Sequence, residues 1–242
     1  MTTSARFSWT VLLPVKVLAR AKSRLAVLAG DRRRELALAL ASDTVAAVLA
    51  CPEVARVVVV TSDPVAGPLL ARLGAVIVAD EPADRSASLA PGTVAAVPAV
   101  LDELGVQDAL NAALRHGAAV AVRRWPGSGL AALTADLPAL SPAELAVALR
   151  AVSAAPGQAA FVPDAAGVGT TMYAVPPGGE FRPLFGGASR ARHAASGAVE
   201  LDFAEMTGLR RDVDTPDDLR AALTLGAGPR TTALAAELLA DA

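Results

Sequence analysis

The sequence predicts an α/β fold, a doubly wound three-layer α/β/α arrangement around a mostly parallel sheet. Two observations predict it: short apolar runs alternate with longer helical stretches, and these runs are apolar throughout, without a polar face. Strands have this character when helices cover both sides of a sheet. With 242 residues, of which 53% are hydrophobic, the chain can form one sizeable core. We therefore expect a single domain over residues 1–242.

The first third of the chain predicts a βαβαβ unit. Apolar runs at 10–15, 56–61 and 75–79 have the length and composition of buried strands. The stretches 31–50 and 65–74 between them have helical length. Because these connections are helical, the strands are expected to run parallel.

The later part predicts a central strand, a further helix and more strands. Residues 130–134 form an apolar run, and Ser141-Pro142-Ala143-Glu144 then reads as a capping box that opens a helix to about residue 154. Strands are also predicted at residues 159–162, 170–174 and 199–201. Near the end, Thr215 is expected to cap a helix with acidic residues in its first turn, closing near Gly226.

The stretch at about 81–105 is the least regular and is expected to be an excursion from the sheet. Serine, proline and glycine interrupt it, although residues 93–104 have partly helical character. A connection this long in a compact α/β domain is a lid, a dimerisation element or a mobile loop. A homodimer is left open on this basis.

Composition excludes several classes of protein. The net charge is −2 and aromatic residues make up only 3%, so no nucleic-acid partner is expected. Every apolar run is interrupted before it could cross a bilayer, and residues 1–6 lack a secretory pattern, so we expect no membrane association and a cytoplasmic location. A single cysteine, Cys51, permits neither an internal disulfide nor a multi-cysteine metal site.

A basic segment follows the first predicted strand, where a parallel sheet binds ligands. Lys16 and Lys22 are the two lysines among 22 basic residues, and Arg24 lies beside them. A compact ammonium suits a phosphate site, although chance in a surface loop is an equal alternative. The chain has no Walker A loop and no Gly-x-Gly-x-x-Gly fingerprint. A triphosphate tail is therefore the ligand that this segment suits best.

Acidic residues follow the central strand and precede the late helix. Asp136 stands where an apolar strand ends, and Asp212 and Asp214 would point the same way in an extended segment. Magnesium takes one or two carboxylates, with phosphates and water completing its shell. The alternatives are that Asp136 is a turn residue and that Asp214 extends the cap of the next helix.

Two glycine-bearing segments suit an anion. Gly167-Val168-Gly169-Thr170-Thr171 offers backbone amides and hydroxyls, or else is a hairpin turn. Residues 185–193 combine a glycine turn, Ser189 as the expected N-cap of a short helix, and arginines, which together suit an anion pocket. His193 has no nucleophile or acid partner in the sequence that would make it catalytic.

Taken together, these segments resemble one family. The motifs are Pro-Val-Lys with Ala-Lys-Ser-Arg-Leu at 14–25, Asp-Leu-Pro-Ala-Leu at 136–140, Gly-x-Gly-Thr-Thr at 167–171, Phe-Gly-x-x-Ser with Ala-Arg-His at 185–193, Ser-Gly-Ala-Val-Glu-Leu at 196–201 and Asp-Val-Asp-Thr-Pro-Asp-Asp-Leu at 212–219. Their order resembles the 2-phospho-L-lactate and phosphoenolpyruvate guanylyltransferases of coenzyme F-420 biosynthesis. The likeness spans nearly the whole chain and implies the nucleotidyltransferase fold, also called the nucleotide-diphospho-sugar transferase or GT-A-like fold.

The resemblance also implies residue roles. It implies that Thr170, Gly186 and Ser189 bind the phosphorylated acid and that Asp136 and Asp212 bind magnesium. The GTP side would comprise Lys16, Lys22, Arg24 and Asn111. Asn111 follows the excursion at 81–105, where family members have only a short turn, so the residues that read guanine are not implied. Another extra piece, at about 118–128, has no implied role.

The implied reaction is attack by the acid's phosphate oxygen on the α-phosphorus of GTP, with release of pyrophosphate. The acid is phosphoenolpyruvate, 2-phospholactate or 3-phosphoglycerate, which the sequence does not distinguish. The alternatives are another nucleotidyltransferase of the same fold, of the molybdopterin or sugar-nucleotide type, and a non-catalytic nucleotide-binding subunit.

Overall fold

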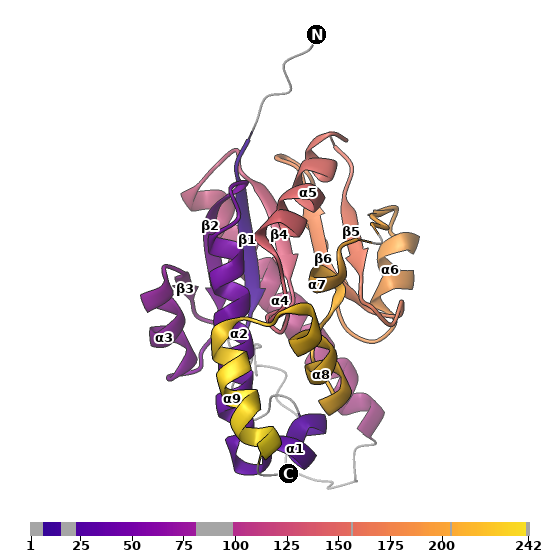
Figure 1. Cartoon of the computed structure of the whole chain (residues 1–242). Coiled ribbons are helices and arrows are strands. Elements are labelled where there is room, and N and C mark those ends of the chain that lie inside the picture. Colours follow the sequence, from indigo (N-terminus) through magenta and orange to yellow (C-terminus); the bar gives the residue numbers. More distant parts are fainter. Residues whose placement is uncertain (1–6, 16–22, 81–98, 156, 204, 241–242) are drawn as a thin grey trace, which may run out of the picture.

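The predicted apolar strands pair into one sheet in the computed structural model, which describes residues 7–15, 23–80, 99–155, 157–203 and 205–240. Within these residues the sheet has seven strands in the order β3-β2-β1-β4-β6-β5-β7. Figure 1 shows β3, β2, β1, β4, β6 and β5 in this order from left to right. Their bounds are β1 Trp9–Pro14, β2 Val54–Val60, β3 Val76–Val78, β4 Gly129–Leu133, β5 Ala160–Pro163, β6 Thr170–Val175 and β7 Val199–Glu200. Strand β6 is antiparallel to β4 and β5, and the remaining pairs are parallel. The expected mostly parallel α/β sheet is confirmed.

Both faces of the sheet are buried, as the uniformly apolar strands predict. In β1, Val11 and Leu13 belong to one apolar cluster and Leu12 to the other. In β4, Ala131 and Ala132 divide between the two clusters in the same way. Since successive side chains of a strand point to opposite faces, each face needs its own layer of helices.

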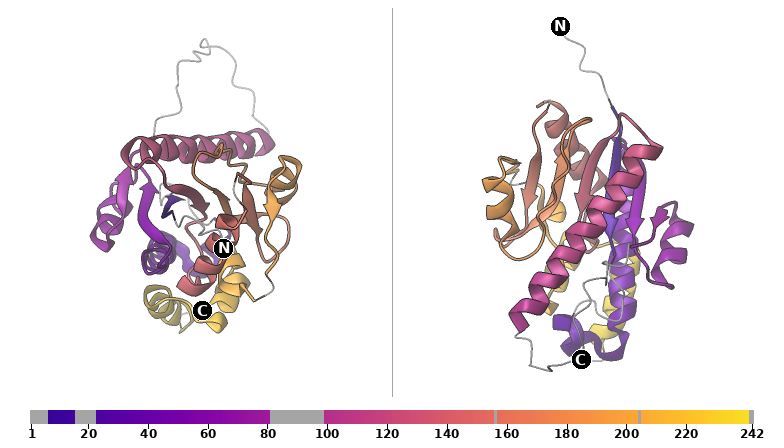
Figure 2. Two further views of the ribbon diagram at one scale, coloured as in Figure 1. Left: turned by 90° about the horizontal axis from the view of Figure 1, so that it is seen from above. Right: turned by 180° about the vertical axis from the view of Figure 1, so that it is seen from behind.

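The helices supply these two layers. Their bounds are α1 Ala26–Ala29, α2 Arg33–Leu49, α3 Ala66–Leu73, α4 Ala99–Arg124, α5 Pro142–Ser153, α6 Ser189–Ala195, α7 Thr207–Arg210, α8 Pro216–Leu225 and α9 Pro229–Ala240. Figure 2 shows α4 along one face of the sheet and α2, α5, α8 and α9 along the other. No helix among the described residues is long and apolar enough to cross a membrane.

The sequence predicts three N-cap residues, of which two are confirmed and the third is wrong. Ser141 and Thr215 each cap a helix through a capping box. Ser189 is not an N-cap: it is the first residue of α6, Ala188 occupies the capping position, and no side chain caps the helix. The Ser189 side chain is instead buried, since the residue is only 1% exposed. A buried position in the first turn of α6 has replaced the capping role that the sequence suggested.

The excursion and the second extra piece lie partly within α4. Residues 81–98 lie outside the described part of the chain, and α4 begins at Ala99, so the last residues of the predicted excursion are helical. Residues 118–124 are the last part of the same helix. Trp125, which follows, lies under the guanidinium groups of Arg56 and Arg124, 5.1 and 5.0 Å from its ring centroid. The piece at 118–128 thus packs the end of α4 against β2.

Helix α9 was not predicted, and a buried carboxylate holds it in place. Asp43 of α2 is 4% exposed and accepts a hydrogen bond of 2.7 Å from the Thr231 backbone N–H at the start of α9. It also accepts from the Arg230 guanidinium at 3.3 Å. Figure 1 shows α9 alongside α2. This contact joins the end of the chain to the helix layer beside β1 and β2.

We expect Asp43→Ala to lower the free energy of unfolding by about 1–3 kcal/mol, because it leaves buried backbone donors of α9 without an acceptor. Asp217→Ala is the matched control: Asp217 pairs only with Arg220 on the surface, its side chain is 93% exposed, and the change should be within about 0.5 kcal/mol. Urea unfolding of both variants measures the difference. Equal stabilities of the two variants would show that Asp43 does not anchor α9.

Candidate functional site

The two predicted metal carboxylates lie on segments that are hydrogen-bonded to each other. The backbone N–H of Val213 donates to the carbonyl oxygen of Asp136 at 3.1 Å. This places Asp212, the preceding residue, beside the turn that carries Asp136. The turn is fixed from α2 as well, since the Leu137 N–H donates to Oγ1 of the fully buried Thr44 at 2.9 Å. Asp136 and Asp212, 76 positions apart in the sequence, are thereby brought onto adjoining segments.

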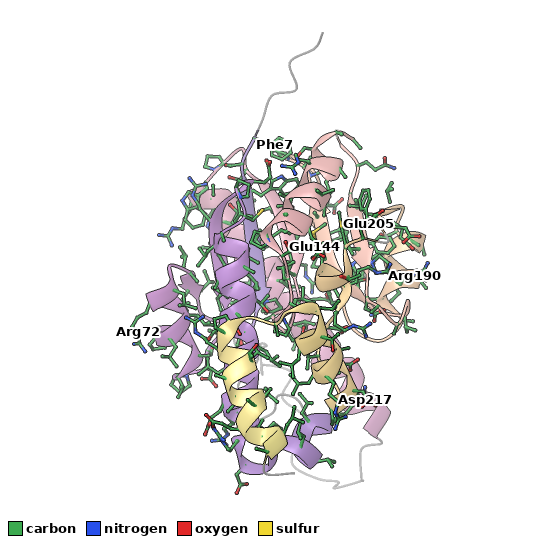
Figure 3. All side chains as sticks on the ribbon, in the orientation of Figure 1. Phe7, Arg72, Glu144, Arg190, Glu205 and Asp217 are labelled. Atoms are coloured by element: carbon green, nitrogen blue, oxygen red, sulfur yellow. The ribbon has the colours of Figure 1, made fainter. Side chains whose placement is uncertain are left out.

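Asp212 and Asp214 differ in how far their side chains are exposed to solvent. Val213 is fully buried, Asp212 is partly buried and Asp214 is exposed. Thr44 and Glu144 were not identified from the sequence as residues that shape this site. Glu144, labelled in Figure 3, accepts hydrogen bonds from the Leu209 N–H at 3.0 Å and the Gly208 N–H at 3.3 Å, besides closing its capping box. It thus fixes α7, from which the Asp212 segment leads.

Arg24 is anchored next to these segments through its neighbour. Leu25 is fully buried in an apolar cluster that also contains Ala139 and Val213, one from each carboxylate segment. Arg24 itself is exposed in the turn Ser23–Leu25. Lys16 and Lys22 lie outside the described residues. Strand β1, which precedes them, pairs with β4, and this pair is where the strand order reverses, the usual place for a ligand in such sheets.

Because β6 runs antiparallel to β4, its first residues lie beside the end of β4. The N–H of Thr134 donates to the carbonyl oxygen of Thr171 at 3.0 Å. Thr170, the first residue of β6, is 5% exposed. The sheet therefore brings the predicted acid-binding threonine to the edge that carries Asp136.

The glycine turn before β6 is the hairpin turn of the alternative interpretation. The carboxylate of Asp164 accepts from the N–H groups of Val168 at 2.9 Å and Gly169 at 2.7 Å. These amides therefore already have an anionic partner within the chain. Asp164, four residues before Val168, was missed as a turn residue. Its signal was an aspartate that follows a predicted strand just before a glycine turn.

The arginines of α6 bind within the protein. Arg190, labelled in Figure 3, makes two hydrogen bonds to Glu200, at 2.9 and 2.7 Å, and one to the Gly167 carbonyl oxygen at 3.0 Å. Arg192 donates to the carbonyl oxygens of Phe185 and Gly186. Arg192 therefore holds the backbone of segment 185–187 in place, and its guanidinium group is used within the protein. Gly186 and Gly187 have φ of 99° and 46°, a conformation that favours glycine.

His193 is fully buried and bonded on both ring nitrogens. Nε2 accepts from the Leu184 N–H at 3.0 Å, and Nδ1 lies 3.0 Å from Thr170 Oγ1. Since Nε2 is an acceptor, a neutral ring carries its proton on Nδ1 and donates it to Thr170. Burial, and secondarily the charge of Arg192, lowers the pKa of His193 to about 4. The ring is accordingly neutral near pH 7 and supports the fold around Thr170.

Asn111 of α4 is also bound at both ends of its amide group. Its Oδ1 accepts from the Phe185 N–H at 2.9 Å, and its Nδ2 donates to the Phe185 carbonyl oxygen at 3.0 Å. The residue is 5% exposed. The structure therefore places the Asn111 side chain against the segment that carries Gly186, which is the predicted acid side of the site.

Two solved structures share this fold. A nucleotidyl transferase from Methanothermobacter thermautotroptrophicus superposes with a TM-score of 0.50 and 18% identity, over 90% of this chain and 97% of the other. A 4-diphosphocytidyl-2C-methyl-D-erythritol synthase gives a TM-score of 0.51 and 13% identity, over 90% and 99%. The fold is thus that of the nucleotidyltransferases.

Curated relatives identify the family within this class. A scan against protein-family models found no match. Phosphoenolpyruvate guanylyltransferase from Thermomonospora curvata is 54% identical over 97% of this chain and 91% of its own length. The protein of that name from Streptomyces avermitilis is 56% identical over 96% and 95%. This chain belongs to the phosphoenolpyruvate guanylyltransferase family.

The low pKa of His193 predicts that stability falls as the pH is lowered. An unfolded histidine binds a proton near pH 6.5, and His193 in the folded protein only near pH 4. Between these values the unfolded state binds more protons, so a contribution of roughly 3 kcal/mol present above pH 6.5 is lost on acidification.

Denaturant unfolding between about pH 7 and pH 4.5 measures this pH dependence. His193→Gln should flatten the curve relative to the unsubstituted protein. If this variant kept the slope of the unsubstituted protein, His193 would not be the group responsible.

Proposed function

We propose that this chain joins the guanylyl group of GTP to phosphoenolpyruvate and releases pyrophosphate, as a step in coenzyme F-420 biosynthesis. The family membership supports this activity, and one observation on the site supports it independently. The hydrogen bond from Val213 to Asp136 joins the two carboxylate segments at the strand-order reversal, next to the start of β6. The relatives are named for phosphoenolpyruvate, which favours this acid over 2-phospholactate and 3-phosphoglycerate.

The residues present fit a magnesium ion. Asp136 and Asp212 supply two hard oxygen donors from adjoining segments, and one or two carboxylates are what magnesium takes from a protein. Among the described residues, no group of three or more His, Cys, Asp or Glu side chains forms a larger metal site. When bound, magnesium would neutralise the triphosphate charge of GTP and polarise its α-phosphoryl group. The side chains of the protein would then determine where the nucleotide binds.

The chain's own residues have to bring two anions into contact. Lys16, Lys22 and Arg24 are proposed to bind the triphosphate, and Thr170, Gly186 and Ser189 the phosphorylated acid. Thr170 Oγ1 accepts a hydrogen bond from the Nδ1–H group of His193. The hydroxyl hydrogen of Thr170 therefore remains available as a donor to an anionic oxygen. Orientation of the acid's phosphate towards the α-phosphorus is the main contribution of this side.

In the proposed reaction, an oxygen of the acid's phosphate forms a bond with the α-phosphorus. The bond from that phosphorus to the oxygen bridging it to the β-phosphorus breaks, and pyrophosphate leaves with the electron pair. The attacking phosphate is already ionised at neutral pH, so no general base is required. The structural engagement of His193 on both ring nitrogens is consistent with this.

Pyrophosphate release with matched substrates tests the function. We expect turnover with GTP and phosphoenolpyruvate, and much less when ATP or CTP replaces GTP, or when 2-phospholactate or 3-phosphoglycerate replaces the acid. Efficient turnover of CTP with a sugar phosphate would assign the chain to a different nucleotidyltransferase activity. No pyrophosphate with any pair would favour a non-catalytic nucleotide-binding subunit.

Asp136→Asn and Asp212→Asn should each reduce magnesium-dependent turnover by about a hundredfold or more, because each removes an anionic ligand while keeping the side-chain shape. Asp214→Asn is the matched control two residues from Asp212. Since Asp214 is exposed, its variant should stay within about threefold of the unsubstituted enzyme. Turnover is measured against magnesium concentration, with circular dichroism to check folding. An Asp136 or Asp212 variant as active as the Asp214 variant would return that aspartate to a turn role.

A further inference from the structure

The backbone of residues 184–186 is held by side chains from two helices. His193 accepts from the Leu184 N–H at 3.0 Å. Asn111 binds both the N–H and the carbonyl oxygen of Phe185, at 2.9 and 3.0 Å. Arg192 adds donors to the carbonyl oxygens of Phe185 and Gly186. Each peptide leading into Gly186 therefore has a side-chain partner.

Regular secondary structure does not hold this segment. Residues 181–188 belong to neither a helix nor a strand, and β6 and α6 lie on either side of them. Gly186 and Gly187 at its end both have positive φ, so the turn itself is conformationally permissive. The position of the Gly186 amide consequently depends on the side chains that bind residues 184 and 185.

The surroundings make these hydrogen bonds strong. The His193 ring is stacked with Tyr173 and Phe161 at centroid distances of 4.8 and 5.5 Å and meets the Phe185 ring edge-on at 5.5 Å. Asn111 is 5% exposed and His193 fully buried. A hydrogen bond shielded from water in this way is stronger than one at the surface, and leaving either partner unsatisfied is correspondingly unfavourable.

We infer that Asn111 and His193 are positioning residues for the phosphorylated acid, acting through the segment Leu184–Gly186 and, for His193, through the Thr170 hydroxyl. This inference rests on the proposed function, because Thr170, Gly186 and Ser189 are proposed there to bind the acid. It assigns Asn111 to the acid side and not to GTP. Its amide oxygen and nitrogen both bind one backbone residue of the acid-side segment, which fixes the orientation of the side chain towards that segment.

Separate Michaelis constants for the two substrates test the inference. Asn111→Ala removes both hydrogen bonds, and Asn111→Asp keeps an acceptor for the Phe185 N–H while losing the donor. We expect the KM for phosphoenolpyruvate to rise about tenfold in each. The KM for GTP and the preference for GTP over ATP should stay within about twofold. His193→Gln should raise the same KM, and it carries the test if an Asn111 variant does not fold.

Leu114→Ala is the matched control on the same helix. Leu114 is fully buried in the apolar cluster that also contains Phe185, but it makes no hydrogen bond to residues 184–186. The variant should lose thermal stability while both KM values stay near those of the unsubstituted enzyme. If it raised the KM for phosphoenolpyruvate as much as Asn111→Ala does, loosened packing would explain both effects and the inference would be overturned.

The remaining outcomes separate this inference from the proposed function. A changed KM for GTP, or a changed preference for GTP over ATP, with phosphoenolpyruvate unaffected would place Asn111 at the nucleotide and overturn the inference. An unsubstituted protein that releases no pyrophosphate would contradict the proposed function. Calorimetric titration of phosphoenolpyruvate in the presence of a non-hydrolysable GTP analogue then decides the inference: tenfold weaker binding by Asn111→Ala supports it, and no binding by the unsubstituted protein overturns it.

Discussion

The hydrogen bond from the Val213 N–H to the Asp136 carbonyl oxygen is the contact on which the candidate site depends. It joins the end of the central strand to the segment before α8, and it leaves one carboxylate on each side of the junction. Val213 is fully buried in a cluster with Leu25, so the same residue links the segment to the start of the chain. Because this backbone pair is fixed by packing on both sides, it can hold two like charges on adjoining segments despite their mutual repulsion. A cation is what would complete such an arrangement.

The antiparallel strand β6 sets the second half of the site. A parallel strand in that place would bring its carboxyl end to the ligand edge, whereas β6 brings its first residue, Thr170. The hairpin before it is closed by Asp164, and Arg190 fixes the same turn to β7 through Glu200. Charged side chains around the proposed acid side therefore bind largely within the protein.

The sequence predicted the fold because the fold depends on local patterns, and Asp136 was placed after a buried strand for the same reason; its metal role stays a prediction. Two-sided apolar strands require helices on both faces, and an acid after a buried strand is placed by the strand itself. Contacts between distant residues were less accessible: α9 is held by Asp43, and Asn111 binds Phe185 across 74 positions. Ser189 carried a local capping signal, but the residue is the buried first residue of α6 and not its cap. The roles of Glu144 and Thr44 were missed for the same reason, since each binds a backbone amide far away in the sequence.

A crystal structure with magnesium and an α,β-methylene analogue of GTP would test the central claim most directly. We expect one metal ion to contact a carboxylate oxygen of Asp136 and one of Asp212, each at about 2.0–2.1 Å, together with the phosphates of the analogue. The Val213 to Asp136 hydrogen bond should be unchanged. A metal ion bound to the phosphates with either aspartate turned away from it would contradict the account, because the junction would then position only one ligand.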